Sequence, residues 1–341
     1  MPPRALIVGL AGARLSAAER AYLEGADPWG VILFARNVES PDQLKELTAE
    51  IRDGLSRADA PILIDQEGGR VQRMGPPHWP AYPAGRRIGE LYTIDPQAGL
   101  EAAHLAGRLI ATDLAGAGIN VACIPLLDLR LEGMDQVIGD RAYDSDPEIV
   151  TALGRAAAEG VRAGGCLPVI KHMPGHGRVL CDTHYALPVV DLAAHQLRRT
   201  DFAPFRELRA LPLGMSAHVV YSAFDSERPA TVSPSIITQV IRSEIGFDGL
   251  LMTDDISMQA LDGAVEQRAC AALAAGCDIV LHCNGDAHEM ERLAEAVPHL
   301  SGRALERAEA ALAALDGPAA PAAPAADVTY ERLQALLAKA A

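Results

Sequence analysis

Short apolar runs recur along the chain, and longer stretches with helical spacing separate them. Each run has five to ten residues with little polar alternation, which is typical of strands buried on both faces of a sheet. Residues 40–55 ("SPDQLKELTAEIRDGL") and 146–164 show the intervening pattern, which predicts helices, and Ser40, Asp146 and Ser235 stand where N-caps are expected. The apolar runs cover 5–10, 30–35, 61–65, 120–129, 168–172, 214–219, 249–255 and 278–283.

Alternation of these eight runs with helical segments predicts a parallel α/β fold. Eight is also the number of strands that closes a (β/α)8 TIM-type barrel, which is the fold we expect. The alternative is an open, doubly wound sheet. It is less favoured because the first strand-to-helix turn reads "GLAGARLS", without the G-x-G-x-x-G dinucleotide fingerprint, and no P-loop follows elsewhere.

Polar residues stand at or near the ends of five consecutive runs. One such residue is more often a cap or a buried hydrogen bond than a catalyst. The carboxyl ends of barrel strands all point to one mouth, however, so five ends in register predict a single site there. The residues are Asp65, Asp128, Lys171, His172, His218, Asp254 and Asp255.

The end of the chain has a different character. Residues 316–327, "DGPAAPAAPAAD", form a Pro/Ala-rich spacer, and "VTYERLQALLAKAA" then predicts a helix with Tyr330, Leu333 and Leu337 on one face. Because that apolar face is short, we favour a helix docked on the barrel over a partner-binding arm. We therefore divide the chain into a catalytic barrel, 1–315, and a spacer with a C-terminal helix, 316–341.

Composition narrows the class of protein. Half of the 341 residues are hydrophobic, and Asp plus Glu exceed Lys plus Arg by 45 to 30, which argues against nucleic-acid or anionic-membrane partners. None of the six cysteines forms a C-x-x-C pair, so we expect reduced thiols and no structural zinc. The N-terminal apolar run of about six residues is too short for a signal-peptide core or a membrane span, and no later segment reaches membrane length without charges. We expect a cytoplasmic protein without a cofactor; its oligomeric state stays open, with a monomer favoured.

The stretch "KHMPGHGRVLCDTH", residues 171–184, concentrates candidate chemistry. His172 and His176 have metal-ligand spacing for a helix, but a Pro-Gly pair between them breaks a helix, and Asp182 or His218 would have to complete such a site. Lys171 and His172 at a strand end offer donors to sugar hydroxyls or an anion. For His176 we favour a loop histidine that bonds the backbone.

Two segments supply an acid/base and a nucleophile. In an extended segment Asp182 and His184 lie on the same side, so the carboxylate can orient the imidazole as a general acid/base. Asp254 follows a buried run and would face the mouth, as a rigid nucleophile must. Asp255 is more simply a helix cap.

Residues 64–73, "IDQEGGRVQR", and 139–147, "GDRAYDSDP", add binding candidates. Asp65 and Arg73 suit recognition of sugar hydroxyls. For Glu67 and Arg70 in the same turn, a structural salt bridge explains the pattern equally well. Arg141 is a site donor or a surface charge.

The motifs "IDQEGGRVQR", "KHMPGHG" followed by "DTH", "SAHVVY" and "TDDISM" occur in an order that resembles the family 3 glycoside hydrolases, from about residue 5 to 315. The resemblance is closest to the single-domain bacterial β-N-acetylglucosaminidases of peptidoglycan recycling. Met173 and Thr183 stand where Phe and Ser are usual in that family. Neither change replaces a group that does chemistry.

The resemblance implies a (β/α)8 barrel and a retaining β-N-acetylhexosaminidase. It implies Asp254 as the nucleophile and His184, assisted by Asp182, as the acid/base. It further implies that terminal N-acetylglucosamine is held by a set of five residues at the mouth: Asp65, Arg73, Arg141, Lys171 and His172. The expected substrate is a GlcNAc-anhydroMurNAc fragment of peptidoglycan, with or without its peptide.

Three other functions compete with this interpretation. One is a metal-dependent hydrolase that uses His172, His176 and Asp182, and another is a barrel that binds sugar without catalysis. The third is phosphorolysis of the same substrate, since a histidine acid/base leaves the site less anionic than a glutamate would.

Overall fold

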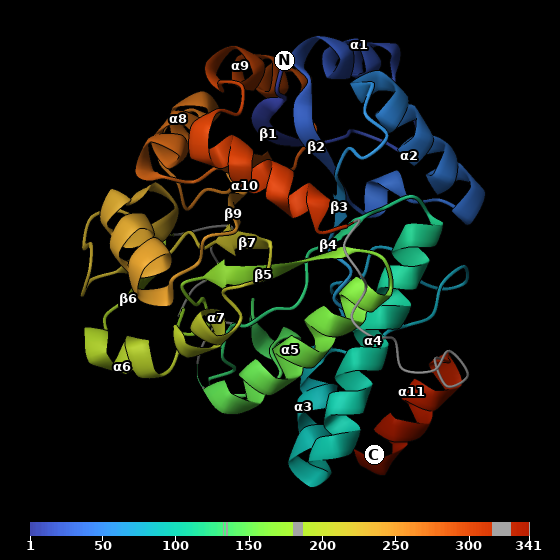
Figure 1. The fold of residues 1–341 in the computed structure, drawn as a ribbon, viewed down its shortest axis with the longest axis vertical. Coiled ribbons are helices and arrows are strands. Elements are labelled where there is room, and N and C mark those ends of the chain that lie inside the picture. Colours follow the sequence, from blue (N-terminus) through green and yellow to red (C-terminus); the bar gives the residue numbers. More distant parts are fainter. Residues whose placement is uncertain (132, 134–135, 180–186, 316–328, 341) are drawn as a thin grey trace.

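Eight parallel strands close into a barrel in the order β1-β10-β9-β7-β5-β4-β3-β2, and helices surround it (Figure 1). The computed structural model describes residues 1–131, 133, 136–179, 187–315 and 329–340. The expected (β/α)8 barrel is therefore confirmed. The strands are β1 Arg4–Gly9, β2 Pro28–Leu33, β3 Ile62–Ile64, β4 Val121–Ala122, β5 Leu167–Met173, β7 Leu213–Ser216, β9 Leu250–Asp255 and β10 Ile279–His282.

Each of the eight apolar runs overlaps a barrel strand, because the side chains of these strands are buried both inside the barrel and against the helices. Ile62, Leu63 and Ile64 are fully buried, for example. The fourth run was predicted as 120–129, but β4 ends at Ala122. Pro125 has no N–H to donate to a ladder, so the rest of this run continues as buried, irregular chain.

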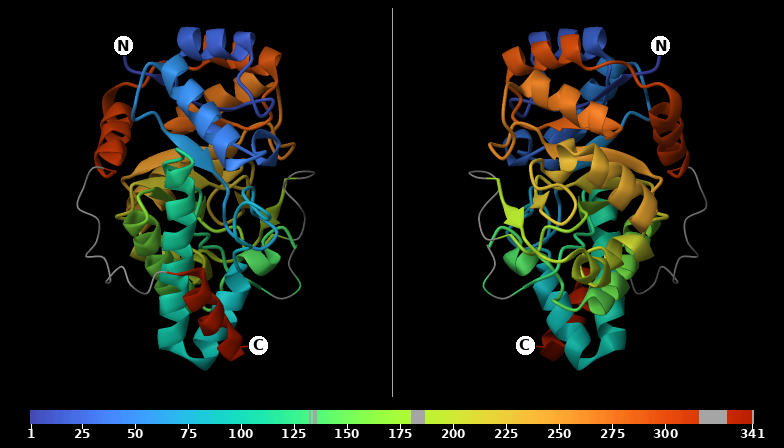
Figure 2. Two further views of the ribbon diagram at one scale, coloured as in Figure 1. Left: turned by 90° about the vertical axis from the view of Figure 1, so that its right-hand side faces the viewer. Right: turned by 90° about the vertical axis from the view of Figure 1, so that its left-hand side faces the viewer.

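The helices fill the segments between the strands and cover the barrel from outside (Figures 1 and 2). A small sheet, β6 Val189–Val190 paired with β8 Val220–Tyr221, was not foreseen. The helices are α1 Ala17–Ala26, α2 Pro41–Leu55, α3 Gly85–Ile94, α4 Pro96–Gly116, α5 Pro147–Ala163, α6 Ala194–Arg199, α7 Ala203–Glu207, a π-helix Ile236–Ile245, α8 Val265–Ala275, α9 Ala287–Ala296, α10 Gly302–Ala313 and α11 Tyr330–Leu337.

Two of the three predicted N-caps are present. Ser40 accepts a hydrogen bond from the Gln43 amide, and Asp146 accepts one from the Glu148 amide. The prediction for Ser235 is wrong, because its backbone is already helical (φ −66°, ψ −46°) and its hydroxyl caps nothing. Ser233 caps this end instead: its hydroxyl accepts a hydrogen bond from the Ile236 amide at 3.2 Å, and residues 234–235, directly before the π-helix, are already helical.

Candidate active site

Six of the predicted site residues line one cavity of about 220 Å³ at the carboxyl ends of the strands. They come from four parts of the chain: Asp65 and Arg73 follow β3, Arg141 follows β4, Lys171 and His172 lie in β5, and Asp254 lies in β9. The barrel thus brings together six residues that span 189 positions of the sequence, from Asp65 to Asp254. Asp182 and His184 lie outside the described residues.

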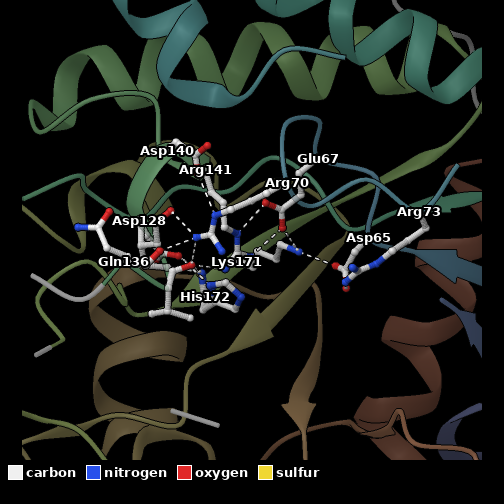
Figure 3. Close-up of polar contacts among 12 residues, drawn as sticks. Asp65, Glu67, Arg70, Arg73, Asp128, Gln136, Asp140, Arg141, Lys171 and His172 are labelled. Carbon is white, nitrogen blue, oxygen red and sulfur yellow. Dashed lines mark hydrogen bonds and ion pairs between the residues drawn. The ribbon is translucent and has the colours of Figure 1, made fainter. Parts of the chain in front are cut away.

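A buried ion network forms one wall of this cavity (Figure 3). Lys171 Nζ lies 2.7 Å from Asp65 Oδ1 and 2.7 Å from Glu67 Oε1. The Glu67 carboxylate also accepts two hydrogen bonds from the Arg141 guanidinium, both at 2.8 Å, with Oε1 shared between Lys171 and Arg141. Arg73 reaches Asp65 more loosely, at 3.5 Å. Glu67 therefore fixes two cations at once, and both keep further N–H donors for a ligand.

The charges in this network are mutually stabilised. Burial alone would lower the pKa of Lys171, but the carboxylates of Asp65 and Glu67 outweigh it and hold that pKa above its ordinary value. Burial would likewise raise the pKa of Glu67, and the adjacent Arg141 and Lys171 instead hold it far below its usual range. The wall therefore stays ionised at neutral pH and offers a ligand permanent charges.

Asp128, a buried residue behind the cavity lining, orients two histidines. Its carboxylate accepts hydrogen bonds from His172 Nδ1 at 2.7 Å and from the backbone N–H of His176 at 2.6 Å. Because the carboxylate holds the proton of His172 on Nδ1, Nε2 is left for a ligand. Asp128, which the sequence indicated only as one of several acidic residues near strand ends, therefore orients the His172 ring.

His176 departs from the expectation of a loop histidine that bonds the backbone. Its ring lies 5.5 Å from the His172 ring, lines the cavity, and has no hydrogen-bond partner at Nδ1 among the described residues. Burial, together with the neighbouring His172, lowers its pKa to about 4. His176 is therefore a neutral group at the site.

Asp254 faces the cavity from the end of β9. Burial would raise its pKa, but the nearby His172 and His218 and the Asp255 amide hold it below the ordinary value. That amide donates to Asp254 Oδ1 at 2.8 Å. Asp254 is thus an ionised carboxylate that is fixed by the Asp255 amide and faces the cavity.

Asp255, next in the chain, bonds inward to the scaffold. Its carboxylate accepts from the Ser257 amide at 3.0 Å and from the Cys283 amide at 3.1 Å. His218 Nε2 lies 3.0 Å from the Asp255 carbonyl and must donate to it. Burial lowers the pKa of His218, so it is a neutral support for the strand end. Asp255 therefore has a structural role, but the prediction of a helix cap is wrong, because the next helix, α8, begins only at Val265 and its N-cap is Ala264.

Phe34 directly follows β2 and lines the cavity, although it was not predicted as a site residue. The guanidinium carbons of Arg36 and Arg73 lie 4.8 Å and 5.6 Å from its ring centroid. Arg36 is itself held by the Leu10 carbonyl at 2.7 Å. Phe34 therefore provides a fixed face against which Arg73 is oriented. An apolar residue at a strand end gives no sequence signal that separates this role from core packing.

Arg70 joins two loops at the cavity rim. It donates to the carbonyl of Val137 at 2.8 Å and pairs with Asp140 at 2.9 Å. Val137 and Ile138 line the cavity. Arg70 does form a salt bridge, as the structural interpretation expected, but with Asp140 in the loop after β4 and not with a residue of its own turn.

Two further properties of the described residues bear on the alternatives. No group of three or more His, Cys, Asp or Glu side chains among them is arranged to hold a metal ion. Of the two residues proposed to complete a metal site, Asp182 lies outside this part of the chain, and both ring nitrogens of His218 already have partners in Thr231 and Asp255. No helix in the same residues has the length and apolarity needed to cross a membrane.

Comparison with known proteins shows the family to which the chain belongs. Residues 7–313 match the family described as "Glycosyl hydrolase family 3 N terminal domain". A β-hexosaminidase of Chromobacterium violaceum is 41% identical over 313 residues, which cover 91% of this chain and 87% of that protein. A β-hexosaminidase of Alkalilimnicola ehrlichii is 43% identical over 283 residues, covering 82% of this chain and 80% of that protein.

Solved structures similar to this chain point to the same family. NagZ from Neisseria gonorrhoeae, in complex with N-trifluoroacetyl-D-glucosamine, is 33% identical with a TM-score of 0.85, over 99% of this chain and 97% of that one. A family 3 β-N-acetylglucosaminidase from Paenibacillus sp. str. FPU-7 is 31% identical with a TM-score of 0.85, and this chain covers 66% of its length. The chain belongs to glycoside hydrolase family 3 and acts as a β-N-acetylhexosaminidase.

Proposed function

We propose that the protein removes terminal N-acetylglucosamine from peptidoglycan fragments, GlcNAc-anhydroMurNAc with or without peptide, with retention of configuration. Asp254 is the nucleophile, and His184 with Asp182 is the acid/base. The observation that carries the proposal is Asp254 itself: an ionised carboxylate open to a cavity that the cations Lys171 and Arg141 also line.

Charge development dictates the first step. Breaking the glycosidic bond builds positive charge on the anomeric carbon and negative charge on the leaving oxygen. Asp254 attacks the anomeric carbon and forms a glycosyl ester, while protonated His184 gives its proton to the leaving sugar. A lowered pKa keeps Asp254 in the nucleophilic form at neutral pH.

The second step returns the enzyme to its starting state. Neutral His184 removes a proton from water, the water oxygen attacks the anomeric carbon, and the bond to Asp254 breaks. Asp182 supports the imidazolium form and so lets one histidine serve as acid and then base.

The ion network serves recognition in this scheme. Asp65, Arg73, Arg141, Lys171 and His172 carry charge-assisted donors and acceptors that match sugar hydroxyls. Because Glu67 already fixes Lys171 and Arg141, and Asp128 fixes His172, these three side chains lose little entropy when the sugar binds. The N-trifluoroacetyl-D-glucosamine bound to the gonococcal relative supports a ligand of this class.

The test uses defined substrates. Purified GlcNAc-anhydroMurNAc should be split into GlcNAc and anhydroMurNAc, with a β-configured product seen by early NMR. Hydrolysis of p-nitrophenyl N-acetyl-β-glucosaminide combined with failure to cleave the fragment would reject the proposed substrate. An α-configured first product would reject the retaining mechanism.

The same assay separates the remaining alternatives. With phosphate present, hydrolysis yields free GlcNAc, whereas phosphorolysis yields GlcNAc-1-phosphate. A metal-dependent hydrolase would lose activity after chelation and recover it with added metal, and the proposed mechanism predicts neither effect.

A further inference from the structure

The C-terminal helix α11 packs across α3 and α4 (Figure 2). Leu333, Leu336 and Leu337 are buried in this contact. At the far end of the helix, Lys339 Nζ lies 3.0 Å from Asp95 at the start of α4. The C-terminal helix predicted from the sequence is thus docked on α3 and α4. Its first residue makes a separate contact, with the loop that precedes α3.

That first residue, Tyr330, contacts the loop between β3 and α3. Its hydroxyl donates to the carbonyl of Ala81 at 2.7 Å. Its ring stands edge-on to Tyr82, with centroids 6.1 Å apart and planes at 89°. The Tyr82 hydroxyl in turn donates to Asp113 in α4 at 2.7 Å. Residues 80–84, which we call the supporting arm, are thereby held between α4 and α11.

The supporting arm is bonded directly to the turn that bears the binding residues. The Gly69 amide donates to the Tyr82 carbonyl at 2.9 Å, and the Tyr82 amide donates to Gln72 Oε1 at 2.9 Å. Gln72 Nε2 completes the link with a bond to the Pro80 carbonyl at 2.7 Å. Three hydrogen bonds therefore connect the arm to residues 69–72.

Close packing makes this connection stiff. Gly68 has φ +92°, and a Cβ there would lie 2.2 Å from the Pro83 carbonyl oxygen. Gly69 has φ +57°, and a Cβ would lie 2.7 Å from Ala84 Cβ. Only glycine fits between turn and arm, so a shift of the arm moves the turn that carries Glu67 and Arg73.

We infer that Tyr330 is a positioning residue: through the supporting arm, the C-terminal helix holds the turn that bears Glu67 and Arg73 in its binding geometry. Sugar affinity then depends on a residue that touches no ligand. The inference rests on the proposed binding role of that turn. It gives the last helix a part in recognition beyond its part in folding.

The experiment compares three full-length variants. Tyr330→Phe removes the hydroxyl and keeps the ring, Tyr330→Ala removes both, and Lys339→Ala weakens docking of the same helix away from the arm. KM and kcat are measured with p-nitrophenyl N-acetyl-β-glucosaminide, and the dissociation constant of a GlcNAc-type inhibitor by calorimetry. Unfolding temperatures report the purely structural cost of each change.

We expect KM and the inhibitor dissociation constant to rise together, by about threefold in Tyr330→Phe and about tenfold in Tyr330→Ala, as loss of one and then two contacts implies. kcat should stay within about twofold, because Asp254 lies on another strand. Lys339→Ala should keep wild-type KM even where its unfolding temperature falls.

A folded Tyr330→Ala variant with wild-type KM and inhibitor affinity would overturn the inference. So would an equal rise of KM in Lys339→Ala, since that would reflect helix docking alone. Failure of the proposed function has a different signature, because wild-type protein would then hydrolyse the p-nitrophenyl sugar but not the peptidoglycan fragment.

Discussion

Glu67→Gln is the most informative single change in the ion network, because it removes one charge and almost no volume. The carboxylate is 6% exposed and meets Arg141 at 2.8 Å and Lys171 at 2.7 Å. Removing one partner of a buried ion pair typically costs about 3–5 kcal/mol. Lys171 keeps Asp65 and the amide keeps one acceptor oxygen, so we expect about 3 kcal/mol at pH 7.

The pH dependence of this loss provides an internal check. The folded-state pKa of Glu67 is depressed, so its stabilisation is complete above the unfolded-state pKa of about 4.3 and is lost as pH falls toward the folded value. The deficit of the variant should therefore shrink below about pH 4, by up to roughly 1.4 kcal/mol per pH unit.

Urea unfolding of both proteins between pH 7 and pH 3.5 measures this difference directly. Glu306→Gln is a matched control, because Glu306 makes an exposed pair with Arg303 and should change stability little. In the same variants, Glu67→Gln should also raise KM, since two binding cations lose their common anchor. A deficit below about 1 kcal/mol at pH 7, or one that does not shrink in acid, would refute the reasoning.

Four further predictions concern the site. Asp254→Asn should bind inhibitor normally but keep less than about a tenth of kcat, and greater activity would rule it out as nucleophile. Lys171→Ala and Arg73→Ala should each weaken GlcNAc-type inhibitors by about tenfold or more in calorimetry, and unchanged affinity in both would put the sugar elsewhere. His184→Ala should spare the first step with a dinitrophenyl leaving group, slow the natural substrate severely and regain turnover with azide; equal slowing without rescue would reject it as acid/base. Phe34→Leu keeps apolar volume but loses the cation–π face, so KM should rise about threefold and Phe34→Tyr should restore it. Equal KM values for Phe34→Leu and wild type would contradict that role.

The fold was predictable because a (β/α)8 barrel buries its strands on both faces. Runs such as Ile62–Ile64 and Ile279–His282 are continuous and apolar for that reason, and they stand out without any alignment. Boundaries were less predictable. The end of β4 depends on the missing N–H of Pro125, and the cap of the π-helix depends on which of two serines, Ser233 or Ser235, leaves the helical backbone first.

Six of the residues predicted for the site line one cavity, but their hydrogen-bond and ion-pair partners were not predictable. Strand-end position sufficed to select Asp65, Lys171 and Asp254. The bonds from Glu67 to Arg141 span 74 positions, and those from Asp128 to His172 span 44. Such pairs follow from the curvature of the closed barrel, which no local pattern encodes. Glu67 therefore looked like part of a turn, and its central place emerged only from the geometry.

The central claim is that Asp254 forms a covalent glycosyl-enzyme, and trapping that ester tests it most directly. A 5-fluoro N-acetylglucosaminyl fluoride should inactivate the enzyme with time. The fluorine at C5 slows both steps by disfavouring positive charge on the sugar, but the anomeric fluoride is a good leaving group and keeps the first step fast, so the glycosyl-enzyme accumulates. Mass spectrometry of the digested protein should then find one added sugar on Asp254. A label on Asp255, or continued full activity of unlabelled protein after exposure, would contradict the account.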